Sequence, residues 1–166
     1  MAGRGTLVCV ELDAKKTRLL AETLAWAGVE RVALVQADAR VAAAEIAARW
    51  VLVDAPCSGT GVIGRHPEAR WRKSPDDGAR LGVLQSELLR AAAGRTAPGG
   101  RLVYSVCSSD SREGREVVEA FLDERPDFAR ATLPARYAPF ARGGDVVVPP
   151  GIDGRDGFFV ATLARG

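Results

Sequence analysis

The sequence predicts an α/β fold with a mainly parallel sheet. Short apolar segments alternate with longer helical patterns along the 166 residues, as they do in βαβ units. Two of these segments, 50–53 and 102–104, each lead into a probable loop that carries a cysteine. Uninterrupted apolar runs are typical of buried parallel strands. We therefore expect Cys57 and Cys107 at the carboxyl ends of two strands, where open α/β sheets bind ligands.

Length and composition indicate a single globular domain over residues 1–166. An apolar content of 47% supports a real core, and no run of about 18 apolar residues predicts a membrane span. The first residues lack an apolar signal core, so we expect a cytoplasmic protein. Three cysteines without a Cys-x-x-Cys pair argue against disulfides and a structural zinc site, so we predict reduced thiols and no metal.

The charge alone does not identify a partner. A formal net charge of +2 is too small to require a nucleic acid. Almost all basic residues are arginines, which suit phosphate contacts. The same bias, with abundant alanine and glycine, is also expected from a high-GC coding sequence, and that explanation is the simpler one.

The first elements alternate regularly. Apolar residues 7–10 predict a strand, and residues 14–27 predict a helix with Leu20 and Leu24 one turn apart and Gly28 as its end. The pattern then predicts a strand, a short helix and another strand at 32–35, 41–48 and 50–53.

The second half begins with a loop of about 20 residues, 55–74, a length typical of functional loops. Ser74 and Pro75 have the residue types of a helix cap and a first helical position, and Leu81, Leu84 and Leu88 follow on one face. The remaining predicted elements are a turn at 97–100, a strand at 101–105, a helix capped by Asp110 or Ser111, and a closing strand at 157–163.

The paired cysteines suit thiolate attack on a pyrimidine base. Carbon 5 of cytosine is too electron-poor to accept a methyl group until a thiolate adds at carbon 6. The intermediate needs a hydrogen-bond donor or acid near ring nitrogen 3. Asp54, at a strand end that we expect to be buried, would be held partly protonated there by desolvation. A second thiol nearby would assist the elimination that follows.

Several segments together resemble the Nop/Sun (Fmu) family of RNA cytosine-5 methyltransferases. They are 54–61, His66-Pro67-Glu68, Trp71-Arg72, 104–109 and 156–159. The resemblance extends from about Gly5 to Leu163. It implies a Rossmann-like class I methyltransferase sheet, mostly parallel with a C-terminal antiparallel strand. It also implies S-adenosylmethionine as methyl donor and RNA as substrate, with ribosomal RNA as the expected kind.

Matching positions in that family imply specific roles. Cys107 would be the nucleophile, and Cys57 would be needed for release of methylated RNA. Asp54 would contact both the target base and the methyl donor, and Pro56, two residues further on, is also assigned to the cofactor site.

Two further acids match cofactor positions in the family. Glu11 would bind the ribose hydroxyls of S-adenosylmethionine, and Asp38 the adenine amino group. Either acid alone is more simply a solvated loop carboxylate or a helix cap. Together, at successive strand ends, they favour a nucleoside pocket.

The long loop combines cations with an aromatic ring, as a single-strand RNA-binding edge does. These residues are Arg65, Arg70, Trp71, Arg72 and Lys73. A solvated basic loop is an equal alternative. His66 is a further candidate for RNA contact, although a lone histidine is more often part of the loop architecture.

The family's glycine-rich cofactor loop and the strand before it have no counterpart here. Ala97–Arg101 resembles that loop in letters but lies between a helix and a strand. Residues 111–116 also depart from the family's usual acid-and-Asn pattern. We therefore expect a truncated catalytic domain whose first strand is missing, to be supplied by an N-terminal segment or a partner.

Two alternatives remain. DNA cytosine methylation is disfavoured, because there the Pro-Cys cysteine attacks and is followed by Gln rather than Ser58. A non-catalytic RNA-binding remnant is favoured by the missing loop, and it predicts RNA binding without binding of the methyl donor.

Overall fold

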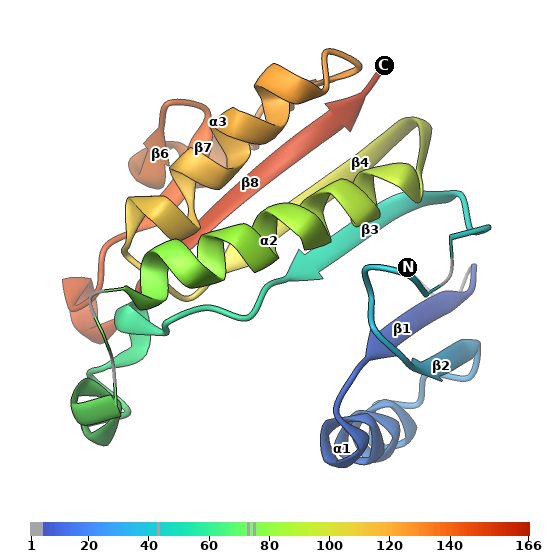
Figure 1. The fold of residues 1–166 in the computed structure, drawn as a ribbon, viewed down its shortest axis with the longest axis horizontal. Coiled ribbons are helices and arrows are strands. Elements are labelled where there is room, and N and C mark those ends of the chain that lie inside the picture. Colours follow the sequence, from blue (N-terminus) through green and yellow to red (C-terminus); the bar gives the residue numbers. More distant parts are fainter. Residues whose placement is uncertain (1–4, 43, 73, 75) are drawn as a thin grey trace. The chain divides into compact units, whose positions relative to one another are not determined.

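The computed structural model describes residues 5–42, 44–72, 74 and 76–166 (Figure 1). The chain divides into two compact units, Met1–Glu45 and Ile46–Gly166. None of the helices among these described residues is long and apolar enough to cross a membrane.

The first unit is a strand–helix–strand arrangement. Its elements are β1 (Leu7–Glu11), α1 (Ala14–Trp26) and β2 (Val32–Gln36). The two strands pair in parallel, with Glu11 opposite Gln36 at their carboxyl ends. Asp13 caps α1 by accepting hydrogen bonds from the backbone N–H groups of Lys15 and Lys16. The predicted strands and helix of this unit are confirmed.

The short helix predicted at 41–48 is wrong. Val41 and Ala42 donate their N–H groups to the carbonyl of Asp38, which closes a turn. Residue 43 lies outside the described residues, and Ala48 already belongs to the next strand, where it pairs with Thr96. This strand pairing is incompatible with a helix that extends to Ala48.

The second unit is a six-stranded sheet with helices. Its elements are β3 (Ala48–Asp54), η1 (Thr60–Val62), η2 (Pro67–Arg72), α2 (Asp77–Gly94), β4 (Thr96–Val106), η3 (Ser111–Glu113), α3 (Arg115–Glu124), β5 (Phe128–Arg130), η4 (Ala135–Phe140), β6 (Ala141–Arg142), β7 (Asp145–Val148), η5 (Ile152–Gly154) and β8 (Phe158–Arg165). The strand order is β3-β4-β8-β7-β6, with β5 also paired to β8. Strands β3 and β4 are parallel, and β8 runs antiparallel to β4. The predicted α/β class with a C-terminal antiparallel strand is confirmed.

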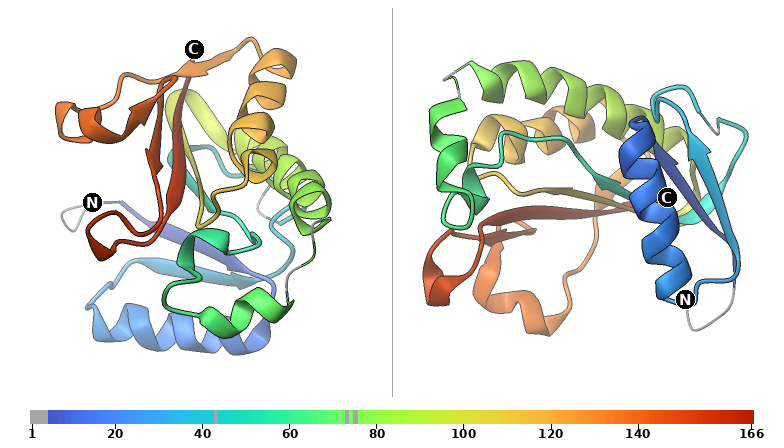
Figure 2. Two further views of the ribbon diagram at one scale, coloured as in Figure 1. Left: turned by 90° about the vertical axis from the view of Figure 1, so that its left-hand side faces the viewer. Right: turned by 90° about the horizontal axis from the view of Figure 1, so that it is seen from below.

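The core of the second unit lies between the sheet and two helices. Figure 2 shows α2 and α3 on the same face of the sheet. Alternate residues of β4, among them Leu102 and Tyr104, are fully buried and belong to one apolar cluster with Leu89 of α2 and Phe121 of α3. Burial of each large apolar side chain contributes about 1.5–3 kcal/mol. This packing fixes β4, and with it the loop that carries Cys107.

The expectation that β3 is buried on both faces is wrong for this structure. Trp50 and Leu52 are each 69% exposed, whereas Val51 and Val53 pack partly against the core. Strand β3 is an edge strand of its sheet. The helices of this unit cover the face of the sheet on which Val51 and Val53 lie. The apolar run therefore gave the strand correctly but not its burial.

The predicted long loop is partly structured, because it contains η1 and η2. At its end, Ser74 and Asp77 interact as in a capping box: Asp77 accepts from the Ser74 N–H, and Ser74 Oγ accepts from the Asp76 N–H. Helix α2 begins at Asp77 with Asp76 as its N-cap, so the cap predicted at Ser74 is two residues too early. The predicted first helical residue, Pro75, lies outside the described residues. The predicted turn at 97–100 lies inside β4, where Gly99 adopts a φ of 71°.

We expect Leu89→Ala to lower the free energy of unfolding by about 2–5 kcal/mol, because it empties a fully buried position between α2 and the sheet. Val83→Ala is the matched control, since Val83 lies on the same helix but is exposed. Urea unfolding followed by circular dichroism measures both variants. Equal stability of the two would contradict the packing described.

Candidate active site

The parallel pairing of β3 and β4 brings the two cysteines together. Asp54 lies opposite Ser105 in the register, so the loops after both strands leave the same edge of the sheet. The Sγ atoms of Cys57 and Cys107 are 3.2 Å apart, within hydrogen-bonding distance for thiols, and both residues are partly buried. Fifty residues of sequence separate them. Both thiols therefore lie together at one edge of the sheet, as the sequence predicted.

The Cys57 thiol is held in its neutral form. Burial raises its pKa to about 12, and the hydrogen bond and charge of Cys107 add to this increase. At neutral pH Cys57 is therefore a protonated thiol within hydrogen-bonding distance of Cys107 Sγ, and either sulfur could be the donor. The environment that suppresses Cys57 as a nucleophile leaves it a proton that it can donate to the neighbouring sulfur.

Asp54 ends β3 at the same edge. Its Oδ1 accepts a hydrogen bond from Ser105 Oγ at 3.0 Å. The carboxyl group is exposed, so the expectation of a buried strand end, on which the predicted desolvation of Asp54 depends, is wrong for this structure. Its exposure follows from that of the β3 face described above.

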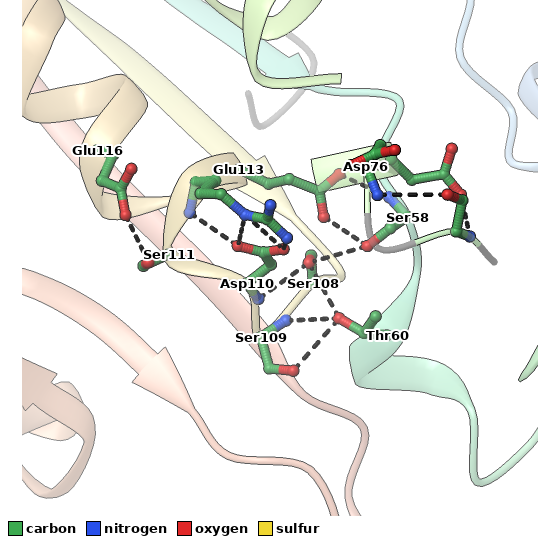
Figure 3. A network of polar contacts seen from close by, with 12 residues as sticks. Ser58, Thr60, Asp76, Ser108, Ser109, Asp110, Ser111, Glu113 and Glu116 are labelled. Carbon is green, nitrogen blue, oxygen red and sulfur yellow. Dashed lines mark hydrogen bonds and ion pairs between the residues drawn. The ribbon is translucent and has the colours of Figure 1, made fainter. Parts of the chain in front are cut away.

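Hydroxyl groups connect the two cysteine loops (Figure 3). Ser58 Oγ lies 3.2 Å from Ser108 Oγ, which in turn lies 3.0 Å from Thr60 Oγ1. The backbone N–H of Ser109 donates to Thr60 Oγ1 at 3.0 Å. Each loop therefore holds the other through short polar side chains next to the cysteines.

The network ends on a buried carboxyl that the sequence analysis did not identify. Glu113 in η3 has no exposed surface, and its Oε1 accepts from the Ser58 N–H at 2.7 Å. Its Oε2 accepts from Ser58 Oγ at 2.5 Å, and Gln85 Nε2 lies 3.3 Å from Oε1. From the sequence, Glu113 is one acid among several near a helix start, and nothing local distinguishes it.

Two glycines bring the backbone close to Cys107. The Gly61 N–H donates to the Cys107 carbonyl at 3.1 Å, and the Gly157 N–H donates to the Gly61 carbonyl at 2.8 Å. A Cβ atom at Gly61 would collide with the carbonyl of Gly157. The glycines of the 54–61 and 156–159 segments are thus explained by close backbone packing.

The two acids predicted for the cofactor lie in the first unit, at the ends of its paired strands. Glu11 ends β1, and its Oε1 accepts from the Asp13 N–H at 2.9 Å. Asp38 follows β2 and forms an ion pair with Arg40 at 2.6 Å. The Arg40 hydrogen bonds lower the pKa of Asp38 to about 2. Both groups are available as acceptors, although Asp38 is already engaged by Arg40.

The predicted RNA-binding residues follow Cys57 in the same unit. Arg65 pairs with Asp156 at 3.0 Å, and His66 Nδ1 lies 3.4 Å from Glu68. Trp71 is 85% exposed in η2. The remaining predicted positions are Arg70 and Arg72, which also lie in η2, and Lys73, which lies outside the described residues.

We expect alkylation of Cys57 by iodoacetamide to accelerate about tenfold per pH unit up to pH 10 without levelling off, because a pKa near 12 keeps the thiolate scarce. An unperturbed thiol with a pKa of 9.0 would begin to level off there. Cys107→Ala should move the rate profile to lower pH, because the hydrogen bond and the charge of Cys107, which both raise the pKa of Cys57, disappear. Mass spectrometry of the Cys57 peptide gives the rates, and a rate that levels off between pH 9 and pH 10 in the unaltered chain would contradict the assignment.

Comparison with known proteins identifies the family. The family model described as "16S rRNA methyltransferase RsmB/F" matches residues 1–164. The probable ribosomal RNA small subunit methyltransferase B of Bacillus subtilis is 37% identical over 173 residues, covering 99% of this chain and 39% of the relative. The crystal structure of PH0851 has a TM-score of 0.91 at 35% identity, covering 98% of this chain and 38% of that one.

The crystal structure of NSun6 from Pyrococcus horikoshii with SFG has a TM-score of 0.84 at 25% identity. The match covers 98% of this chain and 42% of the NSun6 chain. The chain thus spans about two-fifths of the length of these relatives. The chain belongs to the RsmB/F family of 16S rRNA methyltransferases.

Proposed function

We propose that residues 1–166 form part of a methyltransferase catalytic domain that transfers a methyl group from S-adenosylmethionine to carbon 5 of cytosine in ribosomal RNA. The observation that carries this proposal is the pair of thiols 3.2 Å apart at the ends of two parallel strands. One thiol suffices to add to a pyrimidine. A second thiol in contact with the first is placed to assist the elimination that follows the addition.

Cys107 is the proposed nucleophile. Its sulfur adds to carbon 6, and the electron pair displaced from the ring makes carbon 5 nucleophilic. Cys57, kept protonated by burial, donates a hydrogen bond to Cys107 Sγ and stabilises negative charge on that sulfur before the attack. Asp54, oriented by Ser105, is proposed to contact the base at the same edge.

The chemistry of the acids at the strand ends fits the proposed cofactor. S-adenosylmethionine supplies an electrophilic methyl group on a sulfonium. A carboxylate at Glu11 suits two vicinal ribose hydroxyls, because both are donors. Asp38 is ionised and suits an amino group, which it would share with Arg40. Asp54 and Pro56 complete the proposed set.

Release of the methylated base reverses the addition. The carbon 5 proton leaves to water, the bond between Cys107 Sγ and carbon 6 breaks, and its electron pair returns to the sulfur. A hydrogen bond from Cys57 stabilises the departing thiolate, which makes Cys107 Sγ a better leaving group without making it a stronger nucleophile. Loss of the Cys57 thiol is therefore expected to impair release more than attack.

The proposed RNA contacts are Arg65, His66, Trp71, Arg72 and Lys73. The exposed ring of Trp71 offers a stacking surface for an unpaired base, and Arg65 retains an exposed guanidinium beside Asp156.

We expect Cys107→Ala to abolish a denaturant-stable adduct with RNA that contains 5-fluorocytosine, because the fluorine blocks elimination only after the sulfur has added. Cys57→Ala should retain the adduct. Denaturing electrophoresis with labelled RNA measures both variants. Loss of the adduct in Cys57→Ala alone would reverse the two roles.

We expect calorimetry with S-adenosylmethionine to detect binding that Glu11→Ala weakens about tenfold, the effect of losing a hydrogen bond to a charged group. Glu22→Ala is the matched control, because Glu22 is an exposed acid of the same unit in α1. Absence of heat at millimolar ligand, together with retained RNA binding, would favour the RNA-binding remnant over the enzyme.

A further inference from the structure

We propose that Glu113 is the positioning residue that holds Cys57 against Cys107. This inference rests on the proposed function of the thiol pair. Ser58 directly follows Cys57, and both its N–H and its Oγ–H end on the Glu113 carboxyl, at 2.7 and 2.5 Å. The residue next to the buried thiol is therefore attached at two points to one side chain.

The hydrogen-bond directions follow from Glu113. Ser58 Oγ has one proton, and it donates this proton to Glu113 Oε2. Ser58 Oγ then accepts from Ser108 Oγ–H. With its proton used there, Ser108 Oγ accepts from Thr60 Oγ1–H. Glu113 thus sets the orientation of every hydroxyl between the two cysteine loops (Figure 3).

Glu113 is itself rigidly anchored. Its carbonyl accepts from the buried Tyr104 hydroxyl at 2.5 Å, and burial raises the pKa of that phenol, which keeps it a donor. Gln85 Nε2 contacts Glu113 and also donates to the Pro56 carbonyl at 2.8 Å, one residue before Cys57. Cys57 is therefore held from both sides by groups that converge on Glu113.

The two thiols depend on Glu113 unequally. Cys107 follows Val106, a fully buried residue of β4 that pairs with β8, and its position is fixed by the sheet. Cys57 lies three residues beyond the end of β3, in a loop held by side chains. Loss of Glu113 should release Cys57 and leave Cys107 in place.

Burial identifies Glu113 as a positioning residue. A carboxyl with no exposed surface does not touch a substrate. Within the described residues it forms no ion pair, and its partners are the neutral donors of Ser58 and Gln85. Burial of such a polar group lowers stability. In this structure the buried group fixes the geometry of the loop after Cys57.

The test measures the thiol pair directly and needs no enzymatic turnover. In a Cys9→Ser background, the chain is equilibrated with reduced and oxidised glutathione. The two cysteine thiols and one oxidised glutathione give one protein disulfide and two reduced glutathione molecules. The position of this equilibrium, read by mass spectrometry, gives the effective concentration of Cys57 at Cys107.

We expect Glu113→Ala to lower this effective concentration about tenfold, because both hydrogen bonds from Ser58 to the carboxyl disappear. Glu113→Gln should lower it about threefold, since its amide keeps one acceptor and must reverse the hydroxyl chain. Glu116→Gln, an exposed acid that accepts from Ser111 in the same segment, should leave it unchanged. Circular dichroism shows whether each variant folds. If Glu113→Ala does not fold, the isosteric Glu113→Gln variant decides the proposal.

Values within twofold of the unaltered chain in the folded Glu113 variants would overturn the proposal. So would an equal effect of Glu116→Gln. The second readout uses unmodified RNA: Glu113→Gln should accumulate the covalent adduct as Cys57→Ala does, because attack by Cys107 persists while release slows. If the unaltered chain and all variants form no adduct even with 5-fluorocytosine RNA, the proposed function fails, and the thiol equilibrium still decides the role of Glu113.

Discussion

The parallel pairing of β3 with β4 is the constraint on which the site depends. Parallel neighbours end at the same edge of a sheet, so the register that sets Asp54 opposite Ser105 also directs both following loops to one place. A shift of the register by one residue would turn every side chain of β3 to the other face. The core against α2 prevents this, because Val51 and Val53 pack there while Trp50 and Leu52 do not. Apolar packing thus determines where two sulfur atoms meet.

Strand pairing brings the loops together but does not fix their side chains. Beyond the last paired residues, polar side chains hold the loops. The hydroxyls of Ser58, Thr60 and Ser108 link the two loops, and Glu113 accepts the hydrogen bond from Ser58 at the end of this network. Almost every polar atom in this region has a partner; among the described residues, Gln85 Oε1 is the buried side-chain atom without one. A nearly satisfied network of this kind is rigid, because no member can turn without leaving another unpaired.

Local sequence patterns predicted the α/β class, the helix at 14–27 and the placement of both cysteines after strands. These features depend on residues near one another in the chain. The exposure of Trp50 and Leu52 depends on what covers β3, which an apolar run does not specify. Glu113 meets Ser58 across 55 residues, and no periodicity or spacing rule connects them. The sequence therefore indicated where the two thiols of the proposed site lie, whereas the side chains that hold them are evident only from the fold.

Two chemically identical groups need different environments to perform different roles. Burial and the contact with Cys107 raise the pKa of Cys57 and keep its thiol protonated. In the proposed reaction this thiol, 3.2 Å from Cys107 Sγ, would stabilise the thiolate that leaves carbon 6. The benefit depends on distance, because a hydrogen bond to sulfur weakens quickly as the donor moves away. The proposed difference in role between the two thiols therefore depends on a fixed position of Ser58 and its loop, and the buried Glu113 carboxyl supplies the hydrogen bonds that fix it.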